Sequence, residues 1–301
     1  MPSPFRRAAL LAASSLALAA AAACGSEEDT ADDDGVRAVA STDVYGDVVA
    51  AIGGDRVEVT SVLDDPSADP HSFEANTRTQ LAVSRADLVV ANGGGYDDFM
   101  DALVAADGTD AVVLDAVAAS GLDAGAEGFN EHVWYDLEAM DALAGEVVTA
   151  LGEVDPAGAE DYEANGATFR AGLQELVAAG EQARATTQGA GVAVTEPVPG
   201  HLLEALGAED LTPAEFAEAV EEGGDVSPAV LQETLDLIGS GQVRALVYNE
   251  QTSGPQTERV LEAARAAGVD VVPVTETLPE GEDYLSWMRG NLDAVVAALS
   301  A

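Results

Sequence analysis

Four side chains suited to metal coordination stand in predicted loops, each just past an apolar, strand-like run or just before a helix: His71, His132, Glu196 and Glu276. In open α/β sheets, ligands bind at the carboxyl ends of the strands. Two imidazoles and two carboxylates complete the ligand set of a divalent cation. The two carboxylates also balance the charge of such an ion, which could therefore be buried. The chain has no CxxC or HExxH pattern, so residue spacing alone does not reveal this site.

His71 lies in the segment that organises the first half of the chain, Asp69-Pro70-His71-Ser72-Phe73-Glu74. The apolar run 57–63 predicts a strand, and two prolines end regular structure before the histidine is reached. A single loop histidine is more often a surface residue than a ligand. The case for His71 therefore depends on partners elsewhere in a chain that holds three histidines. We expect Asp69 to orient this loop and not to bind the ion.

An alternation of strand and helix patterns positions these loops. Apolar runs predict strands at 36–40, 57–63, 88–91, 111–114, 191–195, 243–248 and 269–274. Capping residues and apolar periodicity predict helices at 44–52, 77–86, 97–106, 137–151, 156–187, 202–206, 228–238, 254–267 and 282–299. Such alternation predicts parallel sheets covered on both faces. We interpret Gly93-Gly94-Gly95 as close backbone packing, and 207–225 as a Gly-rich acidic segment.

The alternation forms two α/β blocks on either side of the longest helical stretch. We expect an N-terminal lobe at 36–153, a linking helix at 154–188 and a C-terminal lobe at 189–301. A helix of some thirty residues spans about 45 Å, which suits a strut between lobes. The expected fold class is therefore α/β, with two Rossmann-like parallel-sheet lobes joined by a long rigid helix.

The N-terminal residues predict a signal and a tether. Arg6-Arg7 and the apolar run 8–23 predict a signal peptide over 1–23. The sequence Ala21-Ala22-Ala23-Cys24-Gly25 resembles a bacterial lipoprotein signal, in which Cys24 would carry the lipid. The alternative is ordinary secretory cleavage, which would leave Cys24 as an odd thiol. The acidic stretch 24–35 predicts a disordered tether. We therefore expect an extracytoplasmic protein that is lipid-anchored to the cell membrane.

Composition argues against one class of partner. The 301 residues carry 55 Asp and Glu against 12 Arg and no Lys, giving a formal net charge of −43. Nucleic-acid phosphates need a basic surface, so we expect no nucleic-acid binding. We interpret most of these carboxylates as a solvated surface that favours solubility.

At the candidate ligands, the chain resembles the zinc/manganese solute-binding proteins of bacterial ABC transporters. The resemblance rests on 69–74, His132-Val133-Trp134, Glu196 ahead of Gly200-His201-Leu202, and Val274-Thr275-Glu276-Thr277 before 284–288. It covers essentially the whole chain after the predicted signal peptide. It implies two α/β lobes joined by a rigid helix, with one Zn²⁺ or Mn²⁺ held between them and passed to an ABC permease.

The resemblance also implies roles for individual positions. His71 and His132 match two histidine ligands of the family's N-terminal lobe. Glu196 matches a position that is His in some members and Glu in others. Glu276 matches a position that is usually Asp, which has one methylene fewer. The stretch 122–130 is short and contains no His, whereas zinc specialists of the family often carry a His-rich acidic loop there.

Three further residues are expected to support the ligands. His201 matches a family position that is normally aromatic, so we expect it at the start of a helix, at the surface or against a ligand. Asn249 and Gln251 end another predicted strand and could hydrogen-bond to the ligands. Trp134 and Trp287 are interpreted as packing residues.

Zinc and manganese both suit the predicted site. Two histidines with two carboxylates are harder than a three-histidine set, which favours manganese, whereas zinc binds most N/O sites more tightly. We favour zinc slightly. The predicted function is high-affinity capture of this ion for import, by a monomer that is not an enzyme.

Two other functions are considered. A lipid-anchored metallohydrolase could use Glu196 or Glu276 as a general base, but it would need an open coordination position. An adhesion or sensor protein with an incidental metal site is the third possibility.

Overall fold

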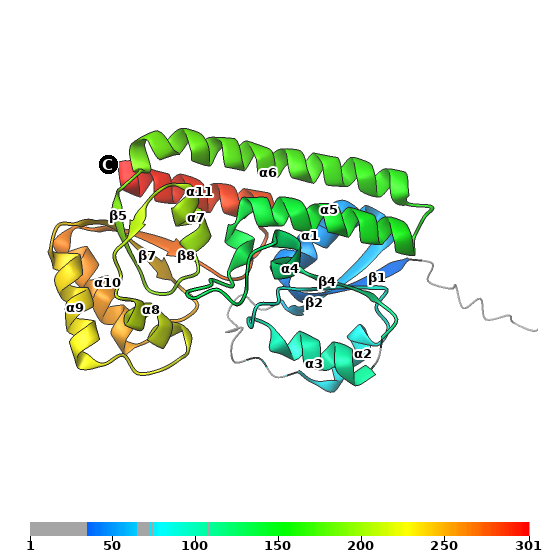
Figure 1. Ribbon diagram of the computed structural model, residues 1–301, viewed down its shortest axis with the longest axis horizontal. Helices are drawn as coiled ribbons and strands as arrows, with labels where there is room; N and C mark the ends of the chain where they lie inside the picture. Colours follow the sequence, from blue (N-terminus) through cyan, green and yellow to red (C-terminus); the bar gives the residue numbers. More distant parts are fainter. Residues whose placement is uncertain (1–34, 65–72, 74, 108, 301) are drawn as a thin grey trace, which may run out of the picture. The chain divides into compact units, whose positions relative to one another are not determined.

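Two parallel β-sheets carry the loops on which the predicted site depends (Figure 1). The computed structural model describes residues 35–64, 73, 75–107 and 109–300. The predictions for Cys24, Asp69 and His71, and most of the predicted tether, therefore fall outside the described residues. No helix in these described ranges is both long and apolar enough to cross a membrane.

The first sheet has four parallel strands in the order β2-β1-β3-β4. The strands are β1 (Val36–Thr42), β2 (Val57–Leu63), β3 (Leu88–Ala91) and β4 (Val112–Asp115). The intervening elements are α1 (Asp43–Gly53), η1 (Gly54–Arg56), α2 (Thr77–Val83), α3 (Asp98–Asp107) and α4 (Ala116–Ser120). The turn η3 (Val133–Tyr135) and the helices α5 (Leu137–Val154) and α6 (Ala159–Thr187) then lead to the second sheet.

The second sheet repeats the arrangement of the first, with the order β6-β5-β7-β8. Its strands are β5 (Gly191–Val194), β6 (Glu209–Asp210), β7 (Val243–Asn249) and β8 (Asp270–Val274). The helices of this half are α7 (Gly200–Ala205), α8 (Ala214–Glu221), α9 (Pro228–Gly239), α10 (Pro255–Ala267) and α11 (Tyr284–Ser300). In both sheets, the strand that comes first in sequence lies between the second and the third.

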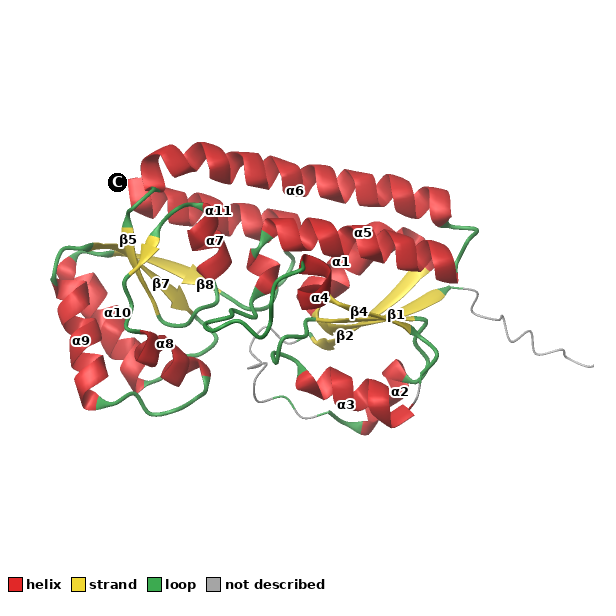
Figure 2. Ribbon diagram, viewed as in Figure 1, coloured by secondary structure: helices red, strands yellow, loops and turns green. Residues whose placement is uncertain are grey.

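Helices cover both faces of each sheet (Figure 2). In β1, Ala38 and Ala40 face a core shared with α5, α6 and α11. Val39 faces the opposite core, which lies between the sheet and the helices α2 and α3. In β7, Val247 joins the shared core and Leu246 the core of α8, α9 and α10. Successive strand residues point to opposite faces, so burial of both faces explains why these strands are almost continuously apolar.

The predicted fold class is confirmed, with two parallel-sheet α/β lobes and element bounds that differ by a few residues. Local capping chemistry accounts for several of the helix starts. The side chain of Asn76 accepts from backbone N–H groups at the start of α2, and Asp136 does so for α5. Ser227 caps α9, whose first residue is Pro228. A proline there loses nothing, because the first helical N–H has no partner within the helix.

The acidic segment 207–225 contains structure that the sequence did not predict. It includes β6, which pairs with β5 over two residues and is too short for an apolar alternation. It also includes α8, which buries Phe216, Ala217 and Val220 on one side and is acidic or small elsewhere. The five-residue helix α4 was likewise not predicted.

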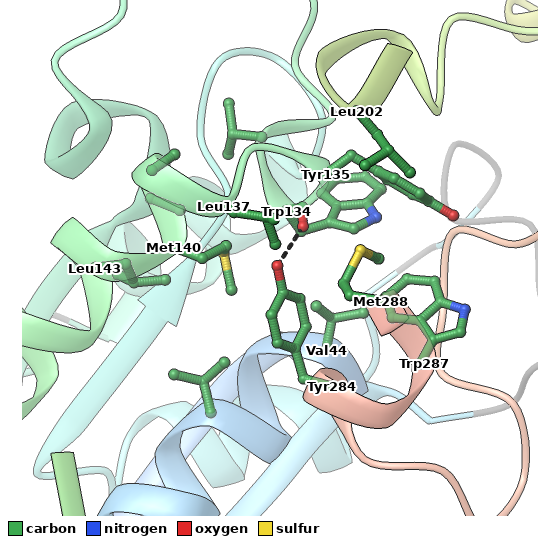
Figure 3. Packing of buried hydrophobic residues seen from close by; sticks show 14 of the residues in the cluster. Val44, Trp134, Tyr135, Leu137, Met140, Leu143, Leu202, Tyr284, Trp287 and Met288 are labelled. Atoms are coloured by element: carbon green, nitrogen blue, oxygen red, sulfur yellow. Dashed lines mark hydrogen bonds between the residues drawn. The ribbon is translucent and has the colours of Figure 1, made fainter. Parts of the chain in front are cut away.

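Two long helices connect the lobes. Helix α6, predicted as a strut, begins at Ala159 and contacts α1 and α5 of the first lobe and α7 and α11 of the second. Helix α11 follows the last strand of the second sheet, yet its first residue packs in the core beside Trp134. Figure 3 shows Tyr284 pointing from α11 toward the backbone of Trp134, and its hydroxyl donates to that carbonyl oxygen at 2.7 Å.

The loop before α11 is also tied to the first lobe through carboxylates of α1. Asp43 accepts from the backbone N–H of Leu278 at 3.1 Å, and Asp47 accepts from that of Tyr284 at 2.9 Å. Burial raises the pKa of Asp43 to about 6, although these backbone hydrogen bonds act in the opposite direction. Burial also raises the pKa of Asp47.

The raised pKa of Asp43 predicts a pH-dependent effect of Asp43→Asn on stability. Below a pH of about 3.8 Asp43 is neutral in both the folded and the unfolded protein. Its contribution to the free energy of unfolding is lost as pH rises through about 6. Asn cannot ionise but can still accept from Leu278. After allowance for solvent screening of a half-buried group, we expect the variant to gain about 1–2 kcal/mol over the wild type at pH 7.5. Near pH 4 this gain should disappear.

Urea unfolding of both metal-free proteins at the two pH values measures the difference. An unchanged difference between pH 4 and pH 7.5 would contradict the assignment.

Candidate metal site

His132 is fully buried at the start of η3, and Asn130 determines which of its ring nitrogens carries the proton. The side-chain oxygen of Asn130 contacts the His132 backbone N–H at 3.1 Å and Nδ1 at 2.7 Å. The amide nitrogen of Asn130 donates to the carbonyl oxygen of Pro197 at 2.9 Å. A carbonyl oxygen only accepts, so the amide cannot be turned the other way. Nδ1 therefore carries a proton, and in the neutral ring Nε2 holds the lone pair that could bind a metal.

Nε2 of His132 faces a carboxylate that the sequence did not single out. Oε1 of Glu221, the last residue of α8, lies 3.4 Å from it. A carboxylate oxygen of Glu131 also lies within 4.8 Å of both atoms. Burial, and next the charges of Glu131, Glu196 and Glu276, raise the pKa of Glu221 to about 8. Three other carboxylates therefore act on Glu221 beside His132.

The predicted carboxylates Glu196 and Glu276 are both buried, and they share one hydrogen-bond donor. The side-chain amide of Asn249 donates to Oε2 of Glu196 and, at 2.9 Å, to Oε1 of Glu276. The topology explains this contact: β7 lies between β5 and β8, so the carboxyl ends of the three strands are neighbours. Asn249 thus lies where the sequence predicted a supporting hydrogen bond.

Gln251 holds the backbone of the Glu276 loop. Its side-chain oxygen accepts from the backbone N–H of Glu276 at 2.5 Å and from that of Thr277 at 3.3 Å. Its amide nitrogen donates to the hydroxyl of Thr277 at 2.8 Å. Asn249 therefore contacts the carboxylate directly, whereas Gln251 positions the backbone that carries it.

Tyr96 links the two lobes at the site. Its hydroxyl donates to Oε2 of Glu276 at 3.1 Å, and its ring lies 5.8 Å from that of His132 and 4.7 Å from that of Trp134, centre to centre. Tyr96 follows β3 and a glycine turn in which Gly93 has a φ of +75°. A Cβ at Gly93 would overlap the carboxylate of Asp115, which agrees with the close packing predicted for this turn, whereas a Cβ at Gly95 would meet nothing within 4 Å.

His201 contacts the loop that carries His132. It is half-buried in the first turn of α7, and its Nε2 donates to the backbone oxygen of Asn130 at 2.9 Å. It therefore supports the loop that positions His132, as a residue against a ligand would. His71 and Asp69 lie outside the described residues. The structure brings His132, Glu196 and Glu276 into one region, and their role as ligands stays a prediction.

Sequence reasoning missed Tyr96 and Glu221. Tyr96 follows a strand and a glycine turn, and the end of a strand is the signal that identified Glu196 and Glu276. Glu221 ends a helix that was itself not predicted, so its only available signal was the apolar spacing of Phe216 and Val220.

Replacing Asn249 with Leu should destabilise the metal-free protein. The substitution removes the donor that Glu196 and Glu276 share, so we expect the unfolding free energy to fall by about 2–3 kcal/mol. Chemical denaturation in the presence of a chelator measures this loss. Thr252→Val is a suitable control, because Thr252 accepts from Asn249 without touching either carboxylate in the contacts described. Equal effects of the two substitutions would argue against the shared donor.

Comparison with known proteins identifies what the whole chain is similar to. The family described as "Zinc-uptake complex component A periplasmic" (ZnuA) matches residues 38–298. The manganese-binding lipoprotein MntA of Halalkalibacterium halodurans is 27% identical over 285 residues, which cover 89% of this chain and 90% of that protein. The iron ABC transporter substrate-binding lipoprotein MtsA of Streptococcus pyogenes serotype M1 is 26% identical over 163 residues, 48% of this chain and 50% of that protein.

Solved structures show the same fold. The solute-binding protein FpvC of Pseudomonas aeruginosa, in complex with Mn²⁺, superposes with a TM-score of 0.73 at 24% identity, covering 88% of this chain and 98% of that one. The periplasmic zinc-binding protein TroA of Treponema pallidum superposes with a TM-score of 0.72 at 19% identity, covering 89% and 100%.

Proposed function

The chain belongs to the ZnuA family of periplasmic zinc-uptake components, and we propose that it captures one divalent transition-metal ion outside the cytoplasm and delivers it to an ABC permease. Members of this family are solute-binding proteins of metal importers. The ion is cargo in this proposal and takes part in no catalytic step. Anchoring through a lipid on Cys24, outside the described residues, would hold the protein near its permease.

The contacts of Glu276 carry the proposal. This buried carboxylate accepts from Asn249 of the second lobe and from Tyr96 of the first, whose ring packs against His132. An ion placed there could take one imidazole nitrogen from the first lobe and carboxylate oxygens from the second. With His71 it would have the predicted set of four ligands.

Zinc and manganese are the two candidate ions. Zinc binds most nitrogen and oxygen sites more tightly, so we favour it slightly on intrinsic affinity. The relative MntA is named for manganese and MtsA for iron, which supports a transition ion without choosing among them.

The lobes should move little when the ion binds. Helix α6 contacts both lobes, and Tyr284 of α11 is anchored in the first. We therefore propose that capture needs only local adjustment of the loops that carry the ligands.

His132→Ala tests the proposed site. Removing a ligand should lower zinc and manganese affinity by about 100-fold or more, beyond the loss typical of a supporting group. Competition titration against a chelator of known affinity measures this, after elemental analysis shows whether the purified wild type holds one ion per chain. His201→Ala is the matched control, expected to lose about 10-fold or less. Tight binding by His132→Ala would exclude this histidine as a ligand.

Metal affinity should also depend on pH. A histidine must be neutral to bind a metal, so affinity should fall steeply below a pH of about 6.5. Calorimetric titration at pH 7.5 and at pH 5.5 measures the change. Equal affinity at both pH values would contradict coordination by imidazole.

A further inference from the structure

Glu221 and His132 turn possible ligand atoms toward each other in a buried place. Asn130 contacts Nδ1 of His132, so Nε2 is the ring nitrogen that lies on the side of Glu221. Nε2 and Oε1 of Glu221 lie 3.4 Å apart, and a carboxylate oxygen of Glu131 lies within 4.8 Å of both. A metal ion that displaces the proton between an imidazole nitrogen and a carboxylate oxygen could bind both atoms.

The distance between these atoms has the size expected for two ligands of one ion. Ligand atoms bound at about 2.0–2.2 Å lie about 2.8–3.6 Å apart, from the right angles of an octahedral site to the wider angles of a tetrahedral one. The 3.4 Å between Nε2 and Oε1 falls within that interval. The Glu221 side chain is 14% exposed, so it is largely removed from water.

The fold holds Glu221 in this position. Phe216, Ala217 and Val220 fix α8 against the second lobe, and Glu221 ends the helix facing His132 of the first lobe. The carboxyl end of a helix carries a partial negative charge, so a buried carboxylate there gains nothing from the helix dipole. A nearby positive ion would compensate both.

We propose that Glu221 adds a carboxylate oxygen to the coordination of the ion bound through His132, and that this addition raises manganese affinity relative to zinc. The inference rests on the proposed function, because it assumes that His132, Glu196 and Glu276 bind the ion. It adds to the four predicted ligands a residue that neither their spacing nor the family resemblance indicated.

Coordination chemistry gives the direction of the preference. Zinc favours four ligands in a tetrahedral arrangement, whereas manganese suits oxygen ligands in octahedral sites. A third carboxylate beside Glu196 and Glu276 increases both the ligand number and the share of oxygen. Glu221 should therefore raise the affinity for manganese more than that for zinc, and so reduce the difference in affinity by which zinc is intrinsically favoured.

Glu221→Gln tests the inference with little change in side-chain volume. We expect manganese affinity to fall by about 10-fold or more, in the range seen when groups supporting a metal site are lost, and zinc affinity by about 3-fold or less. Competition titrations of each metal alone, at one pH, measure both constants. Glu222→Gln is the control, because it removes an exposed carboxylate from the next position and should change neither affinity.

The outcomes separate this inference from the proposed function. If the wild type binds neither metal, the proposed function is wrong. If it binds, and Glu221→Gln leaves both affinities unchanged or lowers them equally, the function stands and the inference is overturned.

A crystal structure of the manganese-bound wild type tests the inference without any substitution. We expect a carboxylate oxygen of Glu221 within about 2.5 Å of the ion, close to the bond lengths of oxygen ligands. An oxygen farther than about 4 Å away, too far to coordinate, would overturn the inference.

Discussion

Buried negative charge is the constraint on which the rest of this structure depends. Glu196 and Glu276 are almost completely buried and are held by the same amide, that of Asn249. An amide dipole stabilises two carboxylates less than a full positive charge would, and ionised groups are costly to bury without compensation. A divalent cation bound between the lobes would compensate both negative charges.

The surrounding architecture keeps these carboxylates in place while leaving little freedom for large motion. One continuous core includes residues of both sheets together with α5, α6 and α11. Trp134 and Tyr135 follow His132 within three residues, and their side chains lie in this core (Figure 3). Their packing holds the loop that carries the histidine. We infer that the lobes form a stiff frame and that an ion is admitted by movement of side chains and loops.

The sequence predicted most of the frame and part of the site, for identifiable physical reasons. The β-branched run 57–63 and the cap at Asp136 act locally, so their patterns are visible in the chain. Glu196 and Asn249 were predicted because each stands at the end of a strand, and parallel neighbours bring such ends together. Tyr96 meets Glu276, and Glu221 meets His132, only across the two lobes. Local patterns do not determine which loops face each other.

The link between the lobes also determines the chemistry of His132. Asn130 presents its oxygen to the histidine only because its nitrogen is held by the carbonyl oxygen of Pro197. Pro197 directly follows Glu196, so the loop that brings a carboxylate from the second lobe also selects the tautomer of a histidine in the first. A metal that binds His132 would therefore find the imidazole already turned with Nε2 toward the carboxylate of Glu221. Preorganisation of this kind lowers the cost of ordering ligands upon binding, which is what high-affinity capture of an ion requires.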